Sequence, residues 1–173
     1  MNTDDLKNLV RTIPDFPKPG IMYRDITPLL ADARGFSDVI ERIAKPHLGQ
    51  VDAVVGIESR GFIFGAPVAY RLGVGLTIAR KPGKLPFETV EQAYELEYGV
   101  AALQMHRDAL GGGARVLIVD DLLATGGTAR AACDLVRAIG GSIVACAFVI
   151  ELTALGGRAR LAPVPCSTLI GYD

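Results

Sequence analysis

Four short apolar segments without polar alternation constrain the fold of this chain more than any other feature. A strand that faces water on one side alternates apolar and polar residues, whereas a strand covered on both faces is apolar throughout. Helical spacing follows the first and third segments, which indicates strand–turn–helix units with right-handed crossovers. We therefore expect an α/β fold with a central, mostly parallel sheet flanked by helices. The expected strands are 53–57, 74–79, 115–119 and 142–150, and the two helices are 62–72 and 128–139.

Chain length and charge narrow the class of protein further. The chain has 173 residues, which predicts a single domain over 1–173, since about 150 residues is typical of one domain. Its net charge is −1, from 18 Lys and Arg against 19 Asp and Glu, whereas a general nucleic-acid binder is usually strongly basic. No apolar stretch is long enough to cross a bilayer, so we expect neither a nucleic-acid nor a membrane partner.

The cysteines and the amino terminus both favour a reducing, cytoplasmic location. Cys133, Cys146 and Cys166 are odd in number and lack the CxxC spacing of zinc sites, so a disulfide framework is not expected. Cys133 and Cys146 lie in apolar patterns that are typical of buried thiols. The first ten residues have neither the basic start nor the apolar run of a signal peptide.

The segment 116–128, VLIVDDLLATGGT, carries the most chemical information. A strand ends in two acids, and a loop of small and hydroxyl residues leads directly into a helix. Glycines let successive N–H groups face one point, and the helix amino end adds positive potential, which together suit a phosphate dianion. The acids are acceptors suited to the hydroxyls of a sugar. The pattern predicts a ribose 5-phosphate site made of Asp120, Asp121, Ala124, Thr125, Gly126, Gly127 and Thr128.

This string resembles the phosphoribosyl-diphosphate signature of type I phosphoribosyltransferases: four apolar residues, two acids, a short run and TGGT. The motifs of P-loop, dinucleotide-binding and α/β-hydrolase proteins are absent from the sequence. The resemblance extends over nearly the whole chain and sharpens to the adenine phosphoribosyltransferase family. It is carried by FPKPGIMYRDITPLL at 16–30, GIESRGFIFG at 56–65, RKPGKLP at 80–86, LEYG at 96–99 and IELTALGGRARLAPVP at 150–165.

The resemblance implies a type I phosphoribosyltransferase fold with a small amino-terminal hood, mainly 14–30, and a mobile lid over roughly 81–98. It implies transfer of the 5-phosphoribosyl group from 5-phospho-α-D-ribose 1-diphosphate to adenine, which yields AMP and diphosphate in purine salvage. Mg²⁺ would be the cofactor, bound mainly by substrate oxygens and water, so no metal ligand is assigned in the chain. A homodimer is also implied, with 62–67 either an apolar contact or ordinary helix core.

The resemblance also assigns residues to the leaving group and to proton transfer. Glu58, Ser59, Arg60 and Gly61, together with Lys81, would bind the diphosphate, and the family often has a non-proline cis peptide in this turn. Arg60 would act in catalysis through forked contacts with the diphosphate; the alternative is a solvated surface arginine. Glu97, in LEYG, would relay the adenine proton, and the other glutamates nearby would be lid charge.

Adenine itself would be bound by the hood and by one residue of the last apolar segment. The main-chain groups of Met22 and Arg24 would bind the hydrogen-bonding edge of the base, while Tyr23 and Leu152 would sandwich the ring; simple packing is the alternative for both.

Two other functions remain open. One is a phosphoribosyltransferase for another nucleobase, which the FPKPGIMYRD segment disfavours. The other is a phosphoribosyl-diphosphate-sensing regulator, which a short, nearly neutral chain disfavours.

Overall fold

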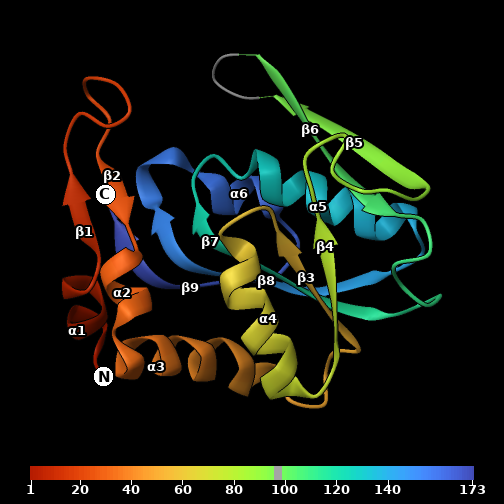
Figure 1. The fold of residues 1–173 in the computed structure, drawn as a ribbon, viewed down its shortest axis with the longest axis horizontal. Helices are drawn as coiled ribbons and strands as arrows, with labels where there is room; N and C mark the ends of the chain where they lie inside the picture. Colours follow the sequence, from red (N-terminus) through yellow and green to blue (C-terminus); the bar gives the residue numbers. More distant parts are fainter. Residues whose placement is uncertain (96–98) are drawn as a thin grey trace.

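A parallel sheet forms the centre of the molecule in the computed structural model, which describes residues 1–95 and 99–173 (Figure 1). Within these residues the sheet has five strands in the order β4-β3-β7-β8-β9, and every neighbouring pair is parallel. The α/β class and the parallel sheet expected from the sequence are therefore confirmed. The strands are β3 (Ala53–Ile57), β4 (Gly75–Ala79), β7 (Arg115–Leu123), β8 (Ser142–Leu152) and β9 (Cys166–Tyr172).

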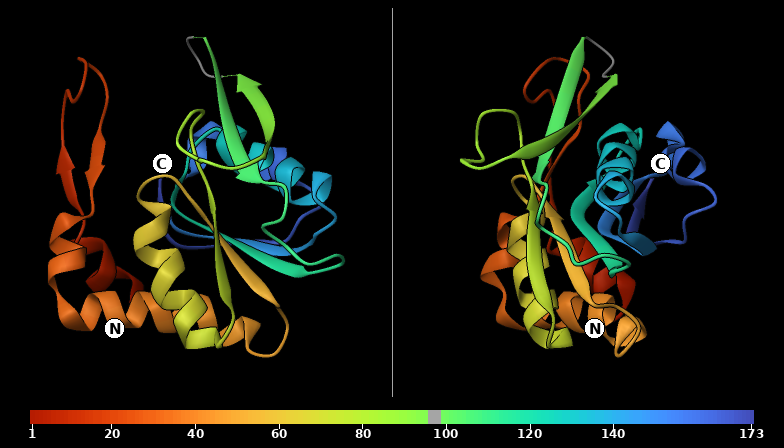
Figure 2. Two further views of the ribbon diagram at one scale, coloured as in Figure 1. Left: turned by 45° about the vertical axis from the view of Figure 1, so that its right-hand side comes forward. Right: turned by 90° about the vertical axis from the view of Figure 1, so that its right-hand side faces the viewer.

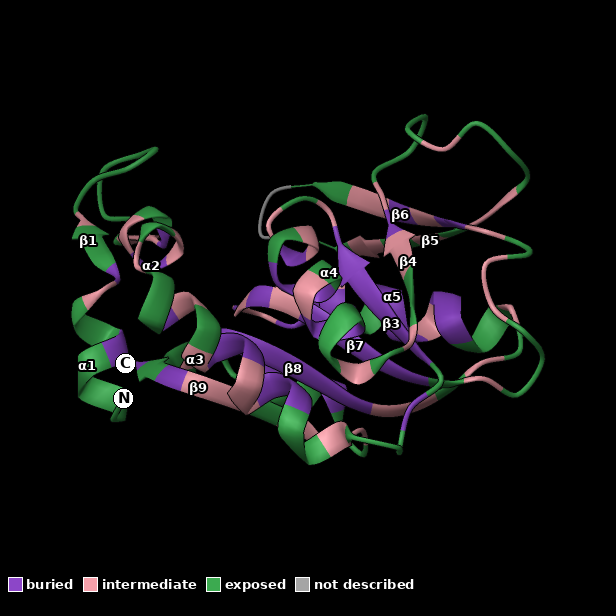
Figure 3. Cartoon of the chain, turned by 60° about the horizontal axis from the view of Figure 1, so that its bottom comes forward, coloured by how far each residue is buried: buried purple, intermediate pink, exposed green. Residues whose placement is uncertain are grey.

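Helices cover both faces of this sheet (Figure 2). On one face, α3 (Ala33–Ala44) and α4 (Gly61–Leu72) pack in a core that includes Val54 and Leu117. On the other face, α5 (Gly127–Ala138) and α6 (Gly157–Leu161) pack in a core that includes Val55 and Ile118. Successive strand residues point to opposite faces, so β3, which is buried on both sides, is apolar throughout (Figure 3).

The amino-terminal part of the chain stands beside the β9 edge of the sheet (Figure 1). A short antiparallel pair, β1 (Arg11–Ile13) and β2 (Tyr23–Asp25), lies on either side of the Pro-rich stretch of the hood. Only the base of this hairpin pairs, and the Pro-rich connection leaves its tip irregular. Three short helices complete this region and its continuation: α1 (Thr3–Asn8), α2 (Thr27–Ala31) and the 3₁₀ turn η1 (Lys45–His47).

An antiparallel pair, β5 (Thr89–Glu95) and β6 (Val100–His106), begins in the segment expected to form the lid, roughly 81–98. The second strand continues past 98, the expected end of the lid, as far as His106. Its buried side chains, Leu103 and Met105, join the core on the α5 face, which explains why the hairpin extends so far. Figure 2 shows the pair rising above the carboxyl ends of the sheet strands.

Several bounds differ from the sequence expectation by one or two residues, and three larger or more informative differences have an identifiable reason. The strand expected to end at Val119 continues through both acids to Leu123, because β8 supplies backbone partners along its whole length. Helix α5 begins at Gly127, one residue early, because Gly126 already adopts the cap conformation. Strand β9 was not expected, since its polar residues and flanking prolines hide a strand that pairs with β8 along one edge only.

Two further expectations concern the thiols and the membrane. Cys133 and Cys146 are free and buried, as expected, and Cys166 is free and half-buried. Among residues 1–95 and 99–173, none of the helices combines the length and apolarity that crossing a bilayer requires.

Candidate active site

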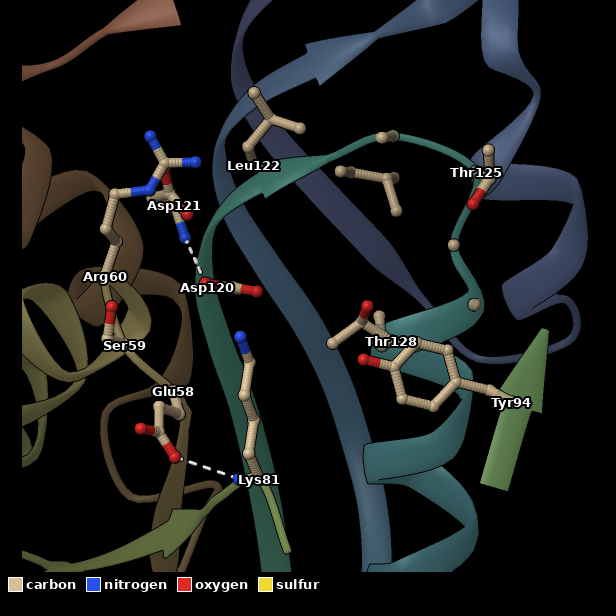
Figure 4. A pocket seen from close by; sticks show the side chains of 15 residues that line it. Glu58, Ser59, Arg60, Lys81, Tyr94, Asp120, Asp121, Leu122, Thr125 and Thr128 are labelled. Carbon is tan, nitrogen blue, oxygen red and sulfur yellow. Dashed lines mark hydrogen bonds and ion pairs between the residues drawn. The ribbon is translucent and has the colours of Figure 1, made fainter. Parts of the chain in front are cut away.

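A pocket of about 350 Å³ lies where the chain leaves the carboxyl ends of β3 and β7 (Figure 4). In parallel sheets this edge is where ligands bind, because loops of neighbouring strands meet there. The pocket collects four segments that are distant in sequence: the turn after β3, Lys81 shortly after β4, Tyr94 of β5, and the end of β7 with the start of α5. It is lined by Glu58, Ser59, Arg60, Lys81, Tyr94 and all residues from Asp120 to Ala129.

Backbone N–H groups at the start of α5 form one wall of the pocket. Gly126 is the cap residue, at φ +80°, and no side chain caps the helix. The first N–H groups of a helix have no partner within the helix, so here they remain available to a ligand. A Cβ on Gly126 would also lie 2.6 Å from the carbonyl oxygen of Gly157, so the position requires glycine twice over. This geometry suits a phosphate group.

Two adjacent carboxylates form the opposite wall. Asp121 is 4% exposed, and its Oδ2 lies 2.9 Å from Nε of Arg60. The side chain of Asp120 points into the pocket, and its Oδ1 accepts a hydrogen bond of 2.8 Å from the Asp121 N–H (Figure 4). Burial, followed by the charge of Asp121, raises the pKa of Asp120. Burial also raises the pKa of Asp121, although the Arg60 guanidinium opposes the shift.

The turn after β3 brings an arginine to these carboxylates. The Glu58–Ser59 peptide is cis, as the resemblance implies. Gly61 allows the turn to approach β7, since a Cβ there would lie 2.9 Å from Oδ1 of Asp120. Nη1 of Arg60 also donates a hydrogen bond of 3.1 Å to the Tyr23 hydroxyl. The Arg60 side chain is 34% exposed, and it pairs with both Asp121 and Tyr23.

The Glu58 carboxylate is engaged by protein groups. It accepts a hydrogen bond of 2.9 Å from the Lys81 N–H and two of 3.2 Å from the Arg80 guanidinium. Burial alone would raise the pKa of Glu58, but the hydrogen bonds from Lys81 and Arg80 outweigh it, and the pKa is lowered. The side chain of Lys81 extends into the pocket toward Asp120 (Figure 4). Glu58 thus fixes the backbone from which Lys81 reaches the pocket.

The lowered pKa of Glu58 predicts a pH-dependent contribution to stability. A carboxylate whose pKa is lower in the folded state stabilises the fold above its unfolded pKa of about 4.3 and loses this contribution as the pH falls through the folded value. We expect Glu58→Gln to lower the free energy of unfolding by about 1.5 kcal/mol at neutral pH, and by progressively less below about pH 4.3. Urea denaturation across this range measures the difference. The exposed pair partner Glu41, as Glu41→Gln, is the control and should show a smaller effect; a difference independent of pH would contradict the prediction.

The four residues expected to bind adenine lie outside the lining of this pocket. Tyr23 is next to it, through the hydrogen bond with Arg60, and its ring meets Phe16 edge-on at 5.1 Å. The Arg24 guanidinium stacks 3.8 Å from the centre of the Tyr172 ring, and Leu152 lies opposite Tyr172 in the pairing of β8 with β9. Met22 is 51% exposed.

The pocket includes residues that sequence reasoning did not assign: Tyr94, Leu122, Leu123 and Ala129. Tyr94 crosses the pocket from β5 and faces Thr128 (Figure 4). Burial alternates along β5, where Val90, Gln92 and Tyr94 are the less exposed face. In the sequence, the alternation of larger side chains at Val90, Gln92 and Tyr94 is the signal that could have assigned Tyr94 to the inner face of the strand. Gly61 supports the pocket without lining it, and Glu97, expected to relay a proton, lies outside the described residues.

Residues 29–165 match the phosphoribosyl transferase domain family. The chain is 58% identical to the adenine phosphoribosyltransferase of Chloroflexus aurantiacus, over 99% of this chain and 100% of that protein. It is 57% identical to the adenine phosphoribosyltransferase of a Roseiflexus species, over 98% of this chain and 99% of that protein.

Solved structures of adenine phosphoribosyltransferases have the same fold as this chain. The adenine phosphoribosyltransferase of Thermoanaerobacter pseudethanolicus superposes with a TM-score of 0.95 at 50% identity, over 99% of this chain and 100% of that one. The Saccharomyces cerevisiae enzyme, complexed with an imino-altritol bisphosphate and adenine, superposes with a TM-score of 0.91 at 39% identity, over 97% and 98% of the two chains. The chain therefore belongs to the phosphoribosyl transferase domain family and, within it, to the adenine phosphoribosyltransferases.

Proposed function

We propose that this enzyme transfers the 5-phosphoribosyl group from 5-phospho-α-D-ribose 1-diphosphate (PRPP) to adenine, with AMP and diphosphate as products. The observation that carries the proposal is one pocket that combines an uncapped helix amino end, two adjacent carboxylates and a paired arginine. These groups match the 5-phosphate, the ribose hydroxyls and the diphosphate of a single donor. The acceptor is inferred from family membership and from the adenine bound in the yeast relative.

The ribose 5-phosphate is proposed to lie between α5 and β7. Its phosphate would accept hydrogen bonds from backbone N–H groups of the 124–128 loop and from the hydroxyls of Thr125 and Thr128, which line the pocket. Asp120 and Asp121 would accept hydrogen bonds from the ribose hydroxyls. Because Asp121 already pairs with Arg60, the sugar and the leaving group would be held by one connected set of charges.

The diphosphate is proposed to lie against the turn after β3. Arg60 and Lys81 line the pocket there and would supply positive charge, and Ser59 would donate hydrogen bonds from its N–H and its hydroxyl. As adenine N9 bonds to C1 of the ribose, the bond from C1 to the diphosphate breaks and its electron pair leaves with the diphosphate. Fixed cations that face this developing charge stabilise the transition state. The Glu58 carboxylate, bound to Arg80, would act by holding the Lys81 backbone.

Mg²⁺ is proposed as the cofactor, and the donor set fits it. Among the described residues, no group of three or more His, Cys, Asp or Glu could hold a metal ion. Glu58 and Asp121 are paired with arginines, which leaves Asp120 as the pocket carboxylate best placed to meet a hydrated ion. Such a site suits Mg²⁺, because substrate phosphates and water molecules supply most of the ligands of this ion. The ion would neutralise charge on the diphosphate.

Adenine is proposed to bind between the hood and the end of β8. Tyr23 and Leu152 would contact the faces of the ring, and the main chain of Met22 and Arg24 would bind its edge. The Arg24 side chain is already committed to Tyr172 and Thr12, which is consistent with a main-chain role. Glu97 would take up the proton that N9 loses. The hood and the β5–β6 pair, both parts of a single domain, would then enclose adenine N9 and the ribose C1 and exclude water from them.

A homodimer is also proposed. Helix α4 exposes Ile63 at 39% and Tyr70 at 90%, and Leu76 on the edge strand β4 is 41% exposed. The neighbouring Phe64 is fully buried, so segment 62–67 combines core residues with an apolar outer face. Light scattering should give twice the chain mass, and a monomer would refute the dimer.

Free cysteines support a cytoplasmic location, where thiols stay reduced.

Base competition tests the acceptor. The enzyme, with PRPP and Mg²⁺, is supplied with equimolar adenine, hypoxanthine, guanine, xanthine and orotate, and the nucleotides are separated by chromatography. We expect AMP in large excess, because the edge of adenine presents its donor and acceptor in the reverse order from that of hypoxanthine. A different principal nucleotide would identify another nucleobase phosphoribosyltransferase. PRPP binding without any nucleotide product would instead favour a regulator.

A further inference from the structure

The loop that lines the phosphate end of the pocket rests directly on a turn from another part of the chain. A Cβ on Gly126 would lie 2.6 Å from the carbonyl oxygen of Gly157, and a Cβ on Gly157 would lie 3.0 Å from the Gly126 nitrogen. The two backbones are therefore in contact with no space for side chains between them. Any shift of the turn at Gly157 must move the loop at Gly126, since interiors are close-packed.

This turn is anchored by the residue that follows it. Nε and Nη2 of Arg158 donate forked hydrogen bonds to the Glu151 carboxylate, at 3.2 Å and 2.5 Å. Nη2 also donates to the Thr168 hydroxyl at 3.0 Å, and that hydroxyl donates to Glu151 Oε2 at 2.9 Å. Nη1 donates to the carbonyl oxygen of Cys166. Arg158 thus fastens the start of α6 to the two strands beneath it, β8 and β9.

Charge and burial indicate that this anchor is well defined. Glu151 is 8% exposed, although it is ionisable, and the hydrogen bond from Arg158 is the main cause that lowers its pKa. Bidentate arginine–carboxylate pairs fix both distance and orientation. The side chains of Glu151, Arg158 and Thr168 do not line the pocket. They would therefore affect a bound ligand indirectly, through the contact between the Gly157 backbone and the loop at Gly126.

We propose that Glu151 and Arg158 are positioning residues for PRPP, acting through Gly157 on the loop that receives the 5-phosphate. The inference rests on the proposed function, because it assumes that this loop binds the phosphate of the donor. A loop held in register keeps several N–H groups aimed at one point before the ligand arrives, and small misplacements of such groups are costly. The pair therefore governs donor affinity rather than the adenine site.

The first test is Arg158→Ala. The Arg158 side chain is 47% exposed, so the substitution removes the anchor without opening the core. We expect KM for PRPP to rise about tenfold, with kcat at saturating PRPP and KM for adenine within about twofold of wild type. Arg158→Lys, which keeps the charge but loses the fork, should recover only part of the affinity. The control is Arg71→Ala, which removes an Arg–Glu pair whose two side chains are both exposed, between Arg71 and Glu41, and should leave all three constants unchanged.

A second variant acts on the contact itself. Gly157→Ala puts a Cβ against the loop at Gly126, whereas a Cβ at Gly112 would meet nothing within 4 Å, so Gly112→Ala is its control. Calorimetric titration with ribose 5-phosphate should show about tenfold weaker binding for Gly157→Ala and Arg158→Ala, and wild-type binding for both controls.

Unchanged ribose 5-phosphate affinity in Arg158→Ala and Gly157→Ala would overturn the inference, as would equal losses in Arg158→Ala and Arg71→Ala. Failure of the proposed function looks different. The wild-type protein would then form no AMP, whereas failure of the inference alone leaves AMP synthesis intact and the PRPP constants of the variants unchanged.

Discussion

Gly126→Ala is expected to lower kcat/KM for PRPP by about 10²–10³-fold, comparable to the loss in kcat when one donor of an oxyanion hole is removed. Alanine at φ +80° is strained, and its Cβ would meet the Gly157 carbonyl oxygen at 2.6 Å, a backbone atom that cannot rotate away. The loop must therefore move, and the N–H groups at the start of α5 would no longer converge on the phosphate. Steady-state kinetics with varied PRPP measures the loss.

The fold should survive this change, because Gly126, although buried, is the cap residue before α5 and belongs to none of the strands of the sheet. Circular dichroism should therefore be unchanged, and adenine binding should weaken far less than PRPP binding. Gly112→Ala again provides the control for a glycine with free space around it. A Gly126→Ala enzyme with kcat/KM within threefold of wild type would remove the loop from donor binding.

The second large effect is expected for Arg60→Ala, with kcat/KM for PRPP again about 10²-fold lower or more. The substitution removes a cation proposed to face the diphosphate. It also leaves Asp121, which is 4% exposed, without the guanidinium 2.9 Å away. A buried carboxylate that loses its partner takes up a proton more readily, so the activity of the variant should fall further at low pH.

Arg60→Lys separates these two causes, since it keeps a positive charge but loses the contacts with Asp121 and Tyr23 together. We expect it to recover part of the activity. Arg115→Ala is the control, because it breaks an exposed arginine–aspartate pair, with Asp52, at the amino end of β7, whereas the pocket lies at the carboxyl end. Wild-type PRPP kinetics in Arg60→Ala would show that the arginine serves only to pair with Asp121.

The parts of the fold that the sequence predicted well are those controlled by local chemistry. The strand 53–57 was found with its bounds because it is apolar throughout and buried on both faces. The continuation of β7 through Asp120 and Asp121 was missed, because acids are rare in buried strands and usually end them. Here Arg60 comes from another element to pair with Asp121, and no local pattern reports that partner.

The candidate site shows the same division. The residues 124–128 were predicted together because glycine, hydroxyl and helix-start chemistry are written in one continuous string, and they line one pocket. The support beneath them was not predicted. The contact between Gly126 and Gly157 and the pair between Arg158 and Glu151 join separate segments, and such long-range contacts leave no periodicity in the sequence. Glu58 differs from both. It was predicted at the diphosphate site and lines the pocket, but its carboxylate accepts hydrogen bonds from Arg80, a partner that the sequence does not indicate.

The most direct test of the account is a crystal structure of the protein with ribose 5-phosphate and adenine. We expect the phosphate within about 2.7–3.2 Å of N–H groups at the start of α5, the ribose hydroxyls on Asp120 and Asp121, and adenine between Tyr23 and Leu152. The Arg158–Glu151 pair should remain intact beneath the loop. A phosphate bound instead at Arg60 and Lys81, with the α5 end left to water, would contradict the assignment of the two phosphate sites.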